Sequence, residues 1–161
     1  MQNVLFLCAE NAARSILAEA LLRHWGEGQL TAFSAGSCPA DAPHPMALRL
    51  LEERGVSTES LRSKSWEEFA NPQAPVMDLV ITLCDTAGDE AVAALSGAPM
   101  HAHWGLPDPE AAIGDETALQ AAFNAVFEQL EQHIAQLVTI PFADRDPKSV
   151  RADLDSIAET A

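Results

Sequence analysis

The sequence is poor in positive charge and contains no tyrosine. Lysine and arginine together occupy nine of the 161 positions, against 24 aspartates and glutamates, so the formal net charge is −15. Only two of the cations are lysines, Lys64 and Lys148, and the arginines are scattered. A protein of this charge repels phosphate backbones and anionic lipid headgroups. We therefore expect neither a nucleic acid nor a membrane among its partners.

Cysteine is also scarce, and Cys8, Cys38 and Cys84 lie far apart in the chain. An odd number of distant thiols does not make a disulfide scaffold, and no C-x-x-C or His/Cys spacing indicates a metal site. The apolar run at residues 4–8 is too short for a signal peptide or a membrane span, and no later run reaches that length. These absences predict a cytoplasmic protein whose thiols stay reduced.

The composition is that of an ordinary globular protein, with 48% apolar and 20% charged residues. The length favours a single domain that can bury its own core. We expect this domain over residues 1–138. The charged extension over residues 139–161 is not expected to be a separate domain.

Strand-like and helix-like segments alternate along the chain, which favours an α/β fold with a parallel sheet. The first strand, residues 4–8, is apolar on both faces, as a central parallel strand should be. Apolar residues at helical spacing predict the helices. The other expected strands are 30–34, 79–84 and 99–104, and the expected helices are 14–25, 45–54, 63–70 and 115–138, with a surface helix from Pro147.

The strongest functional signal is the loop between the first strand and the first helix, Cys8-Ala9-Glu10-Asn11-Ala12-Ala13-Arg14-Ser15. In such a loop successive backbone N–H groups can point inward and bind an anion, and the helix dipole adds positive potential. The glycine-rich Lys-Ser/Thr pattern of a nucleotide-binding loop is missing. We therefore expect residues 9–15 to bind a small tetrahedral oxyanion.

Individual side chains of this loop fit a nucleophilic reaction on that oxyanion. Arg14 can hold two of its oxygens bidentately. The same positive field is expected to lower the pKa of Cys8, so that a thiolate is ready to attack. Ser15 could donate a hydrogen bond to the Cys8 sulfur, and Asn11 tolerates the left-handed backbone angles that a tight loop needs.

The loop and four later motifs resemble the low-molecular-weight protein tyrosine phosphatase superfamily, and more closely its arsenate reductase branch. The matching segments occur in the family's order over about residues 2–138. The resemblance implies an α/β fold with a four-stranded parallel sheet of order 2-1-3-4, helices on both faces, and an active site at the carboxyl ends of the strands. The later motifs are Ser34-Ala35-Gly36, His44-Pro45, residues 80–85 and residues 103–109.

The resemblance also implies two further catalytic residues. Asp108, followed by proline, corresponds to the general acid that protonates the departing oxygen. Cys84 ends a strand parallel to the first, and its surroundings resemble the arsenate reductase segment that carries a second thiol. That thiol would attack the Cys8–arsenic adduct, releasing arsenite and leaving a disulfide.

One departure from the family concerns the thiol relay. Reductases that recycle with thioredoxin typically carry another cysteine seven or eight residues after the second, where this chain has Ala91 and Val92. An external thiol is therefore expected at some step, from glutathione and glutaredoxin, mycothiol or thioredoxin. Cys38, in the loop after the second strand, is an outside candidate for a third thiol.

These observations favour an arsenate reductase, an oxidoreductase without a tightly bound cofactor or metal, whose ligand is arsenate or phosphate. A tyrosine phosphatase is the first alternative, but Glu110 follows Asp108-Pro109 where a phosphatase often has tyrosine, and Glu10 would repel a phosphopeptide. A non-enzymatic oxyanion or arsenic-binding module is the second alternative, and such a binder would need no general acid. We expect His103 and Trp104 to pack behind the acid loop, Lys64 to lie at the surface, and His24 and His133 to lie at the surface or at an interface.

Overall fold

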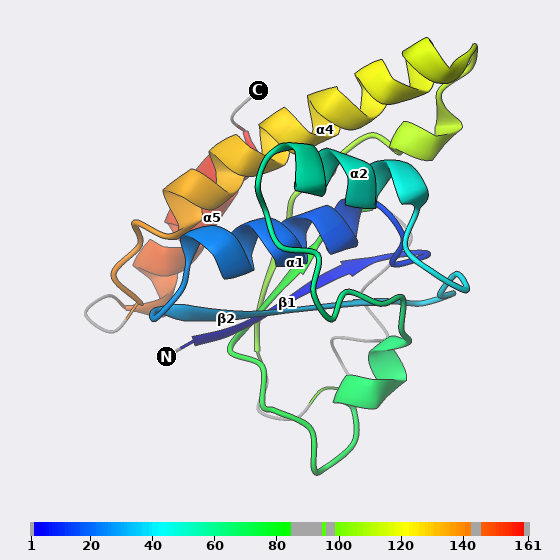
Figure 1. Cartoon of the computed structure of the whole chain (residues 1–161). Coiled ribbons are helices and arrows are strands. Elements are labelled where there is room, and N and C mark those ends of the chain that lie inside the picture. Colours follow the sequence, from blue (N-terminus) through cyan, green and yellow to red (C-terminus); the bar gives the residue numbers. More distant parts are fainter. Residues whose placement is uncertain (1, 85–94, 96–98, 143–145, 160–161) are drawn as a thin grey trace.

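The computed structural model of the chain describes residues 2–84, 95, 99–142 and 146–159. Its sheet has four parallel strands in the order β2-β1-β3-β4, as the resemblance implied. The strands are β1 (Gln2–Cys8), β2 (Leu30–Gly36), β3 (Leu79–Thr82) and β4 (Met100–His103). Strand β1 is an interior strand of this sheet (Figure 1). Cys8 is its last residue and therefore lies at the carboxyl edge of the sheet.

The side chains of β1 alternate between two hydrophobic clusters, although every residue from Val4 to Cys8 is buried. Val4, Phe6 and Cys8 belong to the large cluster, and Leu5 and Leu7 belong to the smaller one. This alternation is the period of two that a pleated strand imposes, with an apolar layer on each side.

Among the described residues, four α-helices cover the face with the large cluster: α1 (Arg14–Trp25), α2 (Pro45–Glu53), α4 (Glu116–Leu137) and α5 (Pro147–Ala158). Figure 1 shows α4 lying across α1 and α2. Three of the four helices begin where a side chain accepts a backbone N–H of the first turn. These residues are His44, Asp115 and Asp146.

The opposite face carries the shorter 3₁₀ helix η1 (Trp66–Phe69) at the second cluster, where Phe69 packs among Leu5, Leu7 and Val80. The sequence predicted a helix over residues 63–70. The helix begins only at Trp66, because Ser65 caps it with its side chain and because Gly36 pairs with Ser65 in an isolated parallel bridge.

The expected helix in the C-terminal extension is confirmed, but it does not lie loosely on the surface. Val150, Leu154 and Ile157 of α5 belong to the large core cluster, and the indole Nε1 of Trp104 donates to the Leu154 carbonyl at 3.3 Å. The domain boundary at residue 138 stays a prediction. None of the helices in the described ranges combines the length and apolar character that crossing a bilayer requires.

Candidate active site

The loop from Ala9 to Ala13 joins the end of β1 to the start of α1. Ala13 occupies the N-cap position and supplies no side-chain cap, so the N–H groups of the first helical turn are left for other acceptors. A helix start of this kind, next to the end of a buried parallel strand, attracts an anion through its N–H groups and its dipole. The geometry is the one expected for an oxyanion-binding loop.

Asn11 holds the loop from inside. It has a φ of 50°, the left-handed conformation that the sequence suggested for it. Its fully buried amide donates to the Ser15 hydroxyl at 2.7 Å and to the Ser34 hydroxyl at 3.0 Å. Its Oδ1 accepts the backbone N–H of Lys64 at 2.9 Å. One side chain thus joins the loop to α1, β2 and the segment before η1.

Backbone contacts hold the loop from outside. Carbonyl oxygens of the loop accept N–H groups from residues 37–44, so they point away from the anion site and leave the loop's own N–H groups to face it. Gly36 makes the close approach possible, because a Cβ there would lie 2.6 Å from the Ala9 carbonyl oxygen. The four bonds are Ser37 to Cys8, Cys38 to Ala9, Ala40 to Glu10 and His44 to Ala12, at 2.8–3.3 Å.

Cys8 lies at the bottom of the loop with 2% of its surface exposed. Its Sγ is 2.8 Å from the Ser15 hydroxyl, the contact that the sequence suggested. The expected lowering of its pKa is wrong, because burial raises the pKa of the Cys8 thiol above its ordinary value. The Ser15 hydrogen bonds, the Asn11 backbone N–H and the Arg14 charge act in the opposite direction. Sequence reasoning counted these groups but not the desolvation of the sulfur.

A cavity of about 50 Å³, lined in part by Cys8, lies at the loop. It brings Cys8, Arg14 and Asp108 together, although Asp108 is 100 residues distant from Cys8 in the chain. Arg14 is fixed to the acid loop, because its Nη1 donates to the Leu106 carbonyl at 3.1 Å. The residues that line the cavity are Cys8, Ala9, Glu10, Ala12, Ala13, Arg14, Asp108 and Glu110.

Asp108 is exposed and begins a 3₁₀ turn, η2 (Pro109–Ala111). Its Oδ1 accepts the backbone N–H of Glu110 at 2.9 Å. The carboxylate therefore caps this turn and also lines the cavity. The capping role and the acid role that the resemblance implies are compatible at one position.

Glu110 is a site residue that sequence reasoning used only as an argument against tyrosine. It lines the same cavity, and the His44 Nε2 is 3.8 Å from its Oε1. Burial, and after it the Glu10 and Asp108 carboxylates, raise its pKa to about 7, against the opposing charge of Arg14. Its position directly after Asp108-Pro109 was the available signal, because a residue at the start of that turn must lie next to the acid.

The second and third thiols both lie near the loop, and none of the three cysteines forms a disulfide. Leu83 donates its N–H to the Leu7 carbonyl at 2.8 Å, so Cys84 follows β3 where Cys8 ends β1. Cys84 is 7% exposed and belongs to the same core cluster as Cys8. Cys38 is exposed and is tied by its backbone to Ala9. Ala91 and Val92, the positions without a relay cysteine, lie outside the described residues.

The sequence suggested that Lys64 lies at the surface, and this prediction is wrong. Lys64 is buried, with 8% of its surface exposed. Its Nζ lies 3.5 Å from the buried carboxylate of Glu19, which also accepts the Ser34 hydroxyl and an Arg23 guanidinium N–H, both at 2.5 Å. The expectation fails because Asn11 draws in the Lys64 backbone and Glu19 compensates its charge. His133 is also buried, at 1% exposure, because α4 turns it toward Trp104 and not toward solvent.

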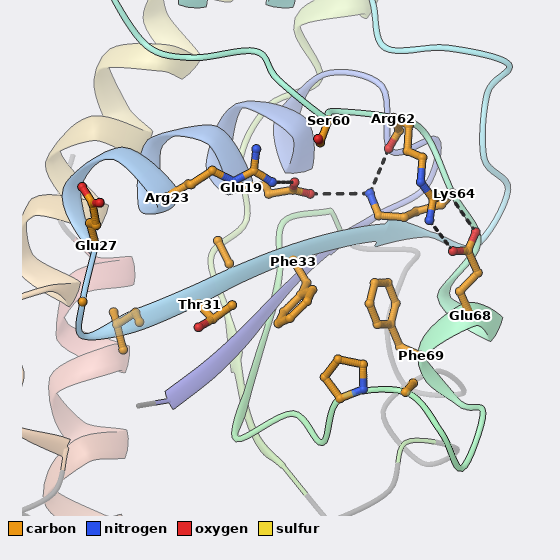
Figure 2. A pocket seen from close by; sticks show the side chains of 15 residues that line it. Glu19, Arg23, Glu27, Thr31, Phe33, Ser60, Arg62, Lys64, Glu68 and Phe69 are labelled. Carbon is orange, nitrogen blue, oxygen red and sulfur yellow. Dashed lines mark hydrogen bonds and ion pairs between the residues drawn. The ribbon is translucent and has the colours of Figure 1, made fainter.

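A larger cavity of about 640 Å³ lies beside the free edge of β2 (Figure 2). Its cations are already paired with carboxylates, since Arg23 and Lys64 contact Glu19 and Arg62 forms two hydrogen bonds with Glu68. Cys8, Arg14, Asp108 and Cys84 do not line it. The candidate active site is therefore the small cavity at the loop, and the large one is a separate feature.

Comparisons with known proteins agree with this geometry. A family described as low molecular weight phosphotyrosine protein phosphatase matches residues 3–154. An arsenate reductase of Halalkalibacterium halodurans is 30% identical over 131 residues, which cover 81% of this chain and 91% of that protein. A glutaredoxin arsenate reductase of Synechocystis sp. is 28% identical and matches 86% of this chain and 97% of its own. A solved structure described as an arsenate reductase in the phosphate binding state has a TM-score of 0.63 at 27% identity, over 84% of this chain and 98% of that one.

Proposed function

The chain belongs to the low-molecular-weight phosphotyrosine protein phosphatase family, and within this family we propose that it is a thiol-dependent arsenate reductase. The observation that carries the proposal is the small cavity at the loop, which holds a thiol, a guanidinium and a carboxylate together. None of the described residues that line it is aromatic, so it offers no stacking surface for a tyrosine ring. A space of about 50 Å³ suits a single tetrahedral oxyanion.

In the first step the loop N–H groups and Arg14 bind arsenate, and the Cys8 thiolate attacks arsenic. An S–As bond forms and an As–O bond breaks, and Asp108 gives its proton to the departing hydroxide, which leaves as water. Ser15 stabilises the thiolate through its hydrogen bond to Sγ. Arsenic remains pentavalent in this adduct.

In the second step another thiolate attacks the Cys8 sulfur. An S–S bond forms, the S–As electron pair passes to arsenic, and arsenite leaves, so that two thiols supply the two electrons. Cys84 is our candidate for this thiol, because it follows β3 next to the end of β1. The resulting disulfide, or a mixed disulfide with an external thiol, must then be reduced from outside.

Relatives with different donors support an external thiol system without identifying it. One relative is described as a glutaredoxin arsenate reductase. The candidates for this chain are glutathione with glutaredoxin, mycothiol, and thioredoxin. The decisive experiment measures arsenite release by the purified protein with each system supplied separately. Arsenite from none of them, together with rapid hydrolysis of a phosphotyrosine peptide, would reject the reductase assignment.

The family description itself favours a second function, phosphotyrosine hydrolysis through a Cys8 phosphoenzyme. In its first step the Cys8 thiolate would attack phosphorus, the P–O bond to the tyrosine would break, and Asp108 would protonate the departing phenolate; water would then cleave the S–P bond. Hydrolysis of p-nitrophenyl phosphate at a rate far below that of arsenate reduction is the expected result. A third possibility, an oxyanion-binding module, predicts that Asp108→Asn changes nothing, whereas the enzyme loses turnover and keeps its ligand.

The role of Cys84 has its own single-turnover test. Arsenate without added reductant should release about one arsenite per chain and leave a Cys8–Cys84 disulfide, detected by peptide mapping. Cys84→Ser should stop this turnover. A Cys38→Ser variant is the matched control, because Cys38 is also a thiol near the loop but is exposed. A Cys84→Ser protein with unchanged turnover would instead assign the second step to an external thiol.

A further inference from the structure

An unusual feature of the small cavity is its negative charge. Three carboxyl groups line it, those of Glu10, Asp108 and Glu110, against the single guanidinium of Arg14. An anion that enters therefore approaches more acidic than basic side chains. The attraction of the loop N–H groups and the α1 dipole must overcome this repulsion, unless one of the carboxyl groups holds a proton.

The fold keeps Glu110 at this position. Its backbone N–H is bound by Asp108, and the preceding Pro109 is buried. The side chain contacts His44, whose Nδ1 accepts the Met46 N–H and so leaves Nε2 as the nitrogen facing Glu110. The backbone of Glu110 is therefore held beside the cavity, and His44 contacts its carboxyl group.

The backbone of Glu10 is also held, because it belongs to the loop itself. Its carbonyl accepts the Ala40 N–H at 2.9 Å, which fixes the backbone from which its side chain extends. The Glu10 and Glu110 carboxyl groups line the same cavity of about 50 Å³, so two ionised carboxylates would repel each other there, and a proton on one of them relieves this repulsion. The groups that face Glu110 are thus Glu10, Asp108, His44 and Arg14, and only Arg14 has a permanent positive charge.

We propose that Glu10 and Glu110 form a proton-coupled gate at the mouth of the oxyanion loop, and that Glu110 recognises the ligand in its protonated state. A dianion that binds in the cavity raises the cost of ionising both carboxyl groups. Binding therefore keeps a proton on the pair, and the Glu110 O–H can donate to an oxyanion oxygen. When both groups are ionised, the same site repels the ligand.

This inference rests on the proposed function in one respect, that the loop binds an oxyanion. It concerns binding and not turnover. It predicts that a doubly charged oxyanion binds together with a proton. The free pair begins to lose its proton near pH 7, because the pKa of Glu110 is about 7. Affinity should then fall with rising pH, by up to about tenfold per pH unit when one proton is taken up.

Sulfate is the appropriate probe, because it is tetrahedral and stays doubly charged throughout this range, whereas phosphate and arsenate titrate themselves. Calorimetric titrations in buffers of different ionisation enthalpy measure both the affinity and the protons taken up. For the wild-type protein we expect weakening between about pH 7 and about pH 8.5, with uptake approaching one proton per sulfate. Glu110→Gln should bind about as tightly as the wild type near pH 6 and much less pH-dependently above pH 7.

Two further variants make the test specific. Glu10→Gln should bind sulfate more tightly than the wild type at the alkaline end, because one repelling charge is gone. Glu116→Gln, an exposed carboxylate at the start of α4, is the matched control and should behave as the wild type. Repeating the series in a Cys8→Ser background removes any contribution from the titration of the thiol.

Wild-type binding without proton uptake, with the same pH dependence as Glu110→Gln, overturns the gate. Failure of sulfate to bind the wild type near pH 6 also overturns it, because the protonated pair should then admit a dianion. Neither result depends on arsenite formation. Arsenate reduction assays can therefore fail or succeed independently of the gate.

Discussion

Glu19 and Lys64 form a buried ion pair, with 3.5 Å between the carboxylate Oε1 and the Nζ and with side chains only 4% and 8% exposed. The pair reaches the active loop through Ser34, which donates to Glu19 and accepts from Asn11. Figure 2 shows Arg23 approaching the same carboxylate from α1. One buried carboxylate therefore compensates two cations and orients the hydroxyl on which Asn11 depends.

Replacing Glu19 by glutamine should destabilise the protein by about 3 kcal/mol, because it leaves the Lys64 ammonium buried without its counter-charge. Urea unfolding measures the effect. Burial already lowers the pKa of Lys64 and Glu19 opposes that shift, so the pKa falls further in the variant. Between this lowered pKa and the ordinary value of 10.5, the unfolded chain binds more protons than the folded one. The free energy of unfolding of the variant should therefore rise with pH over this range. Glu53→Gln, in an exposed pair with Arg49, should cost less than about 1 kcal/mol.

Cys8→Ser should abolish arsenate turnover while phosphate or arsenate still binds. The loop N–H groups and Arg14 remain, but a hydroxyl of ordinary acidity is a poor nucleophile at arsenic. Activity assays and calorimetry on the same preparation separate the two effects. Reductase activity above background in this variant would exclude Cys8 as the nucleophile.

Ser15→Ala should slow alkylation of Cys8 by iodoacetamide by roughly tenfold at a fixed pH, because the thiolate loses a hydrogen bond. In both proteins the rate should still be rising above neutral pH, since burial raises the pKa of the Cys8 thiol. The exposed Cys38 thiol is an internal reference in each sample, and mass spectrometry follows both sites. Equal Cys8 rates in the two proteins would show that Ser15 does not stabilise the thiolate.

Gly36→Ala should weaken oxyanion binding and destabilise the protein by about 1–3 kcal/mol, because the new Cβ meets the Ala9 carbonyl and the Asn11 backbone. Gly28→Ala is the control. Gly28 has a φ of 85° with no heavy atom within 4 Å of a Cβ, so alanine there costs only the conformational strain, about 1 kcal/mol. We expect Gly28→Ala to leave phosphate affinity unchanged. Equal affinities in both variants would mean that the β2 contact does not shape the loop.

The free energy of unfolding should fall as pH rises from 5 to 8, through the pKa of about 7 that Glu110 has in the folded state. The sign follows because the folded protein keeps a proton that the unfolded chain releases near its ordinary pKa of 4.5. Glu110→Gln should show a smaller fall than the wild type. Parallel urea titrations at several pH values test this without any ligand, and identical slopes would contradict the raised pKa.

The sequence was sufficient for the elements that have strong local patterns. The first helix has the predicted bounds, Arg14–Trp25, and α4 differs from its prediction by one residue at each end. The ends of the strands were predicted less accurately, because a strand ends where its hydrogen bonds to the neighbouring strands end. β2 continues to Gly36 since that residue pairs with Cys8 on one side and Ser65 on the other. No local pattern around residues 34–36 contains this information.

The candidate site also has features that the sequence predicts and features that it does not. The loop motif identified the residues around the anion site, and resemblance identified Asp108. Burial and long-range neighbours were not accessible from the sequence, and they determine the raised pKa of Cys8, the interior position of Lys64 and the raised pKa of Glu110. Each of these depends on side chains from segments that meet only after folding, such as Glu19 with Lys64 or Glu10 with Glu110.

The bonds that join the active loop to residues 37–44 have a consequence for how the sequence can vary. All four run between main-chain atoms, from Ser37, Cys38, Ala40 and His44 to the loop carbonyls. Main-chain hydrogen bonds do not require particular side chains. These four bonds can therefore persist while the residues at most of these positions change. Only substitutions that remove an N–H, above all proline, break them. Divergent chains can therefore share the loop's shape without sharing the residues that support it from outside.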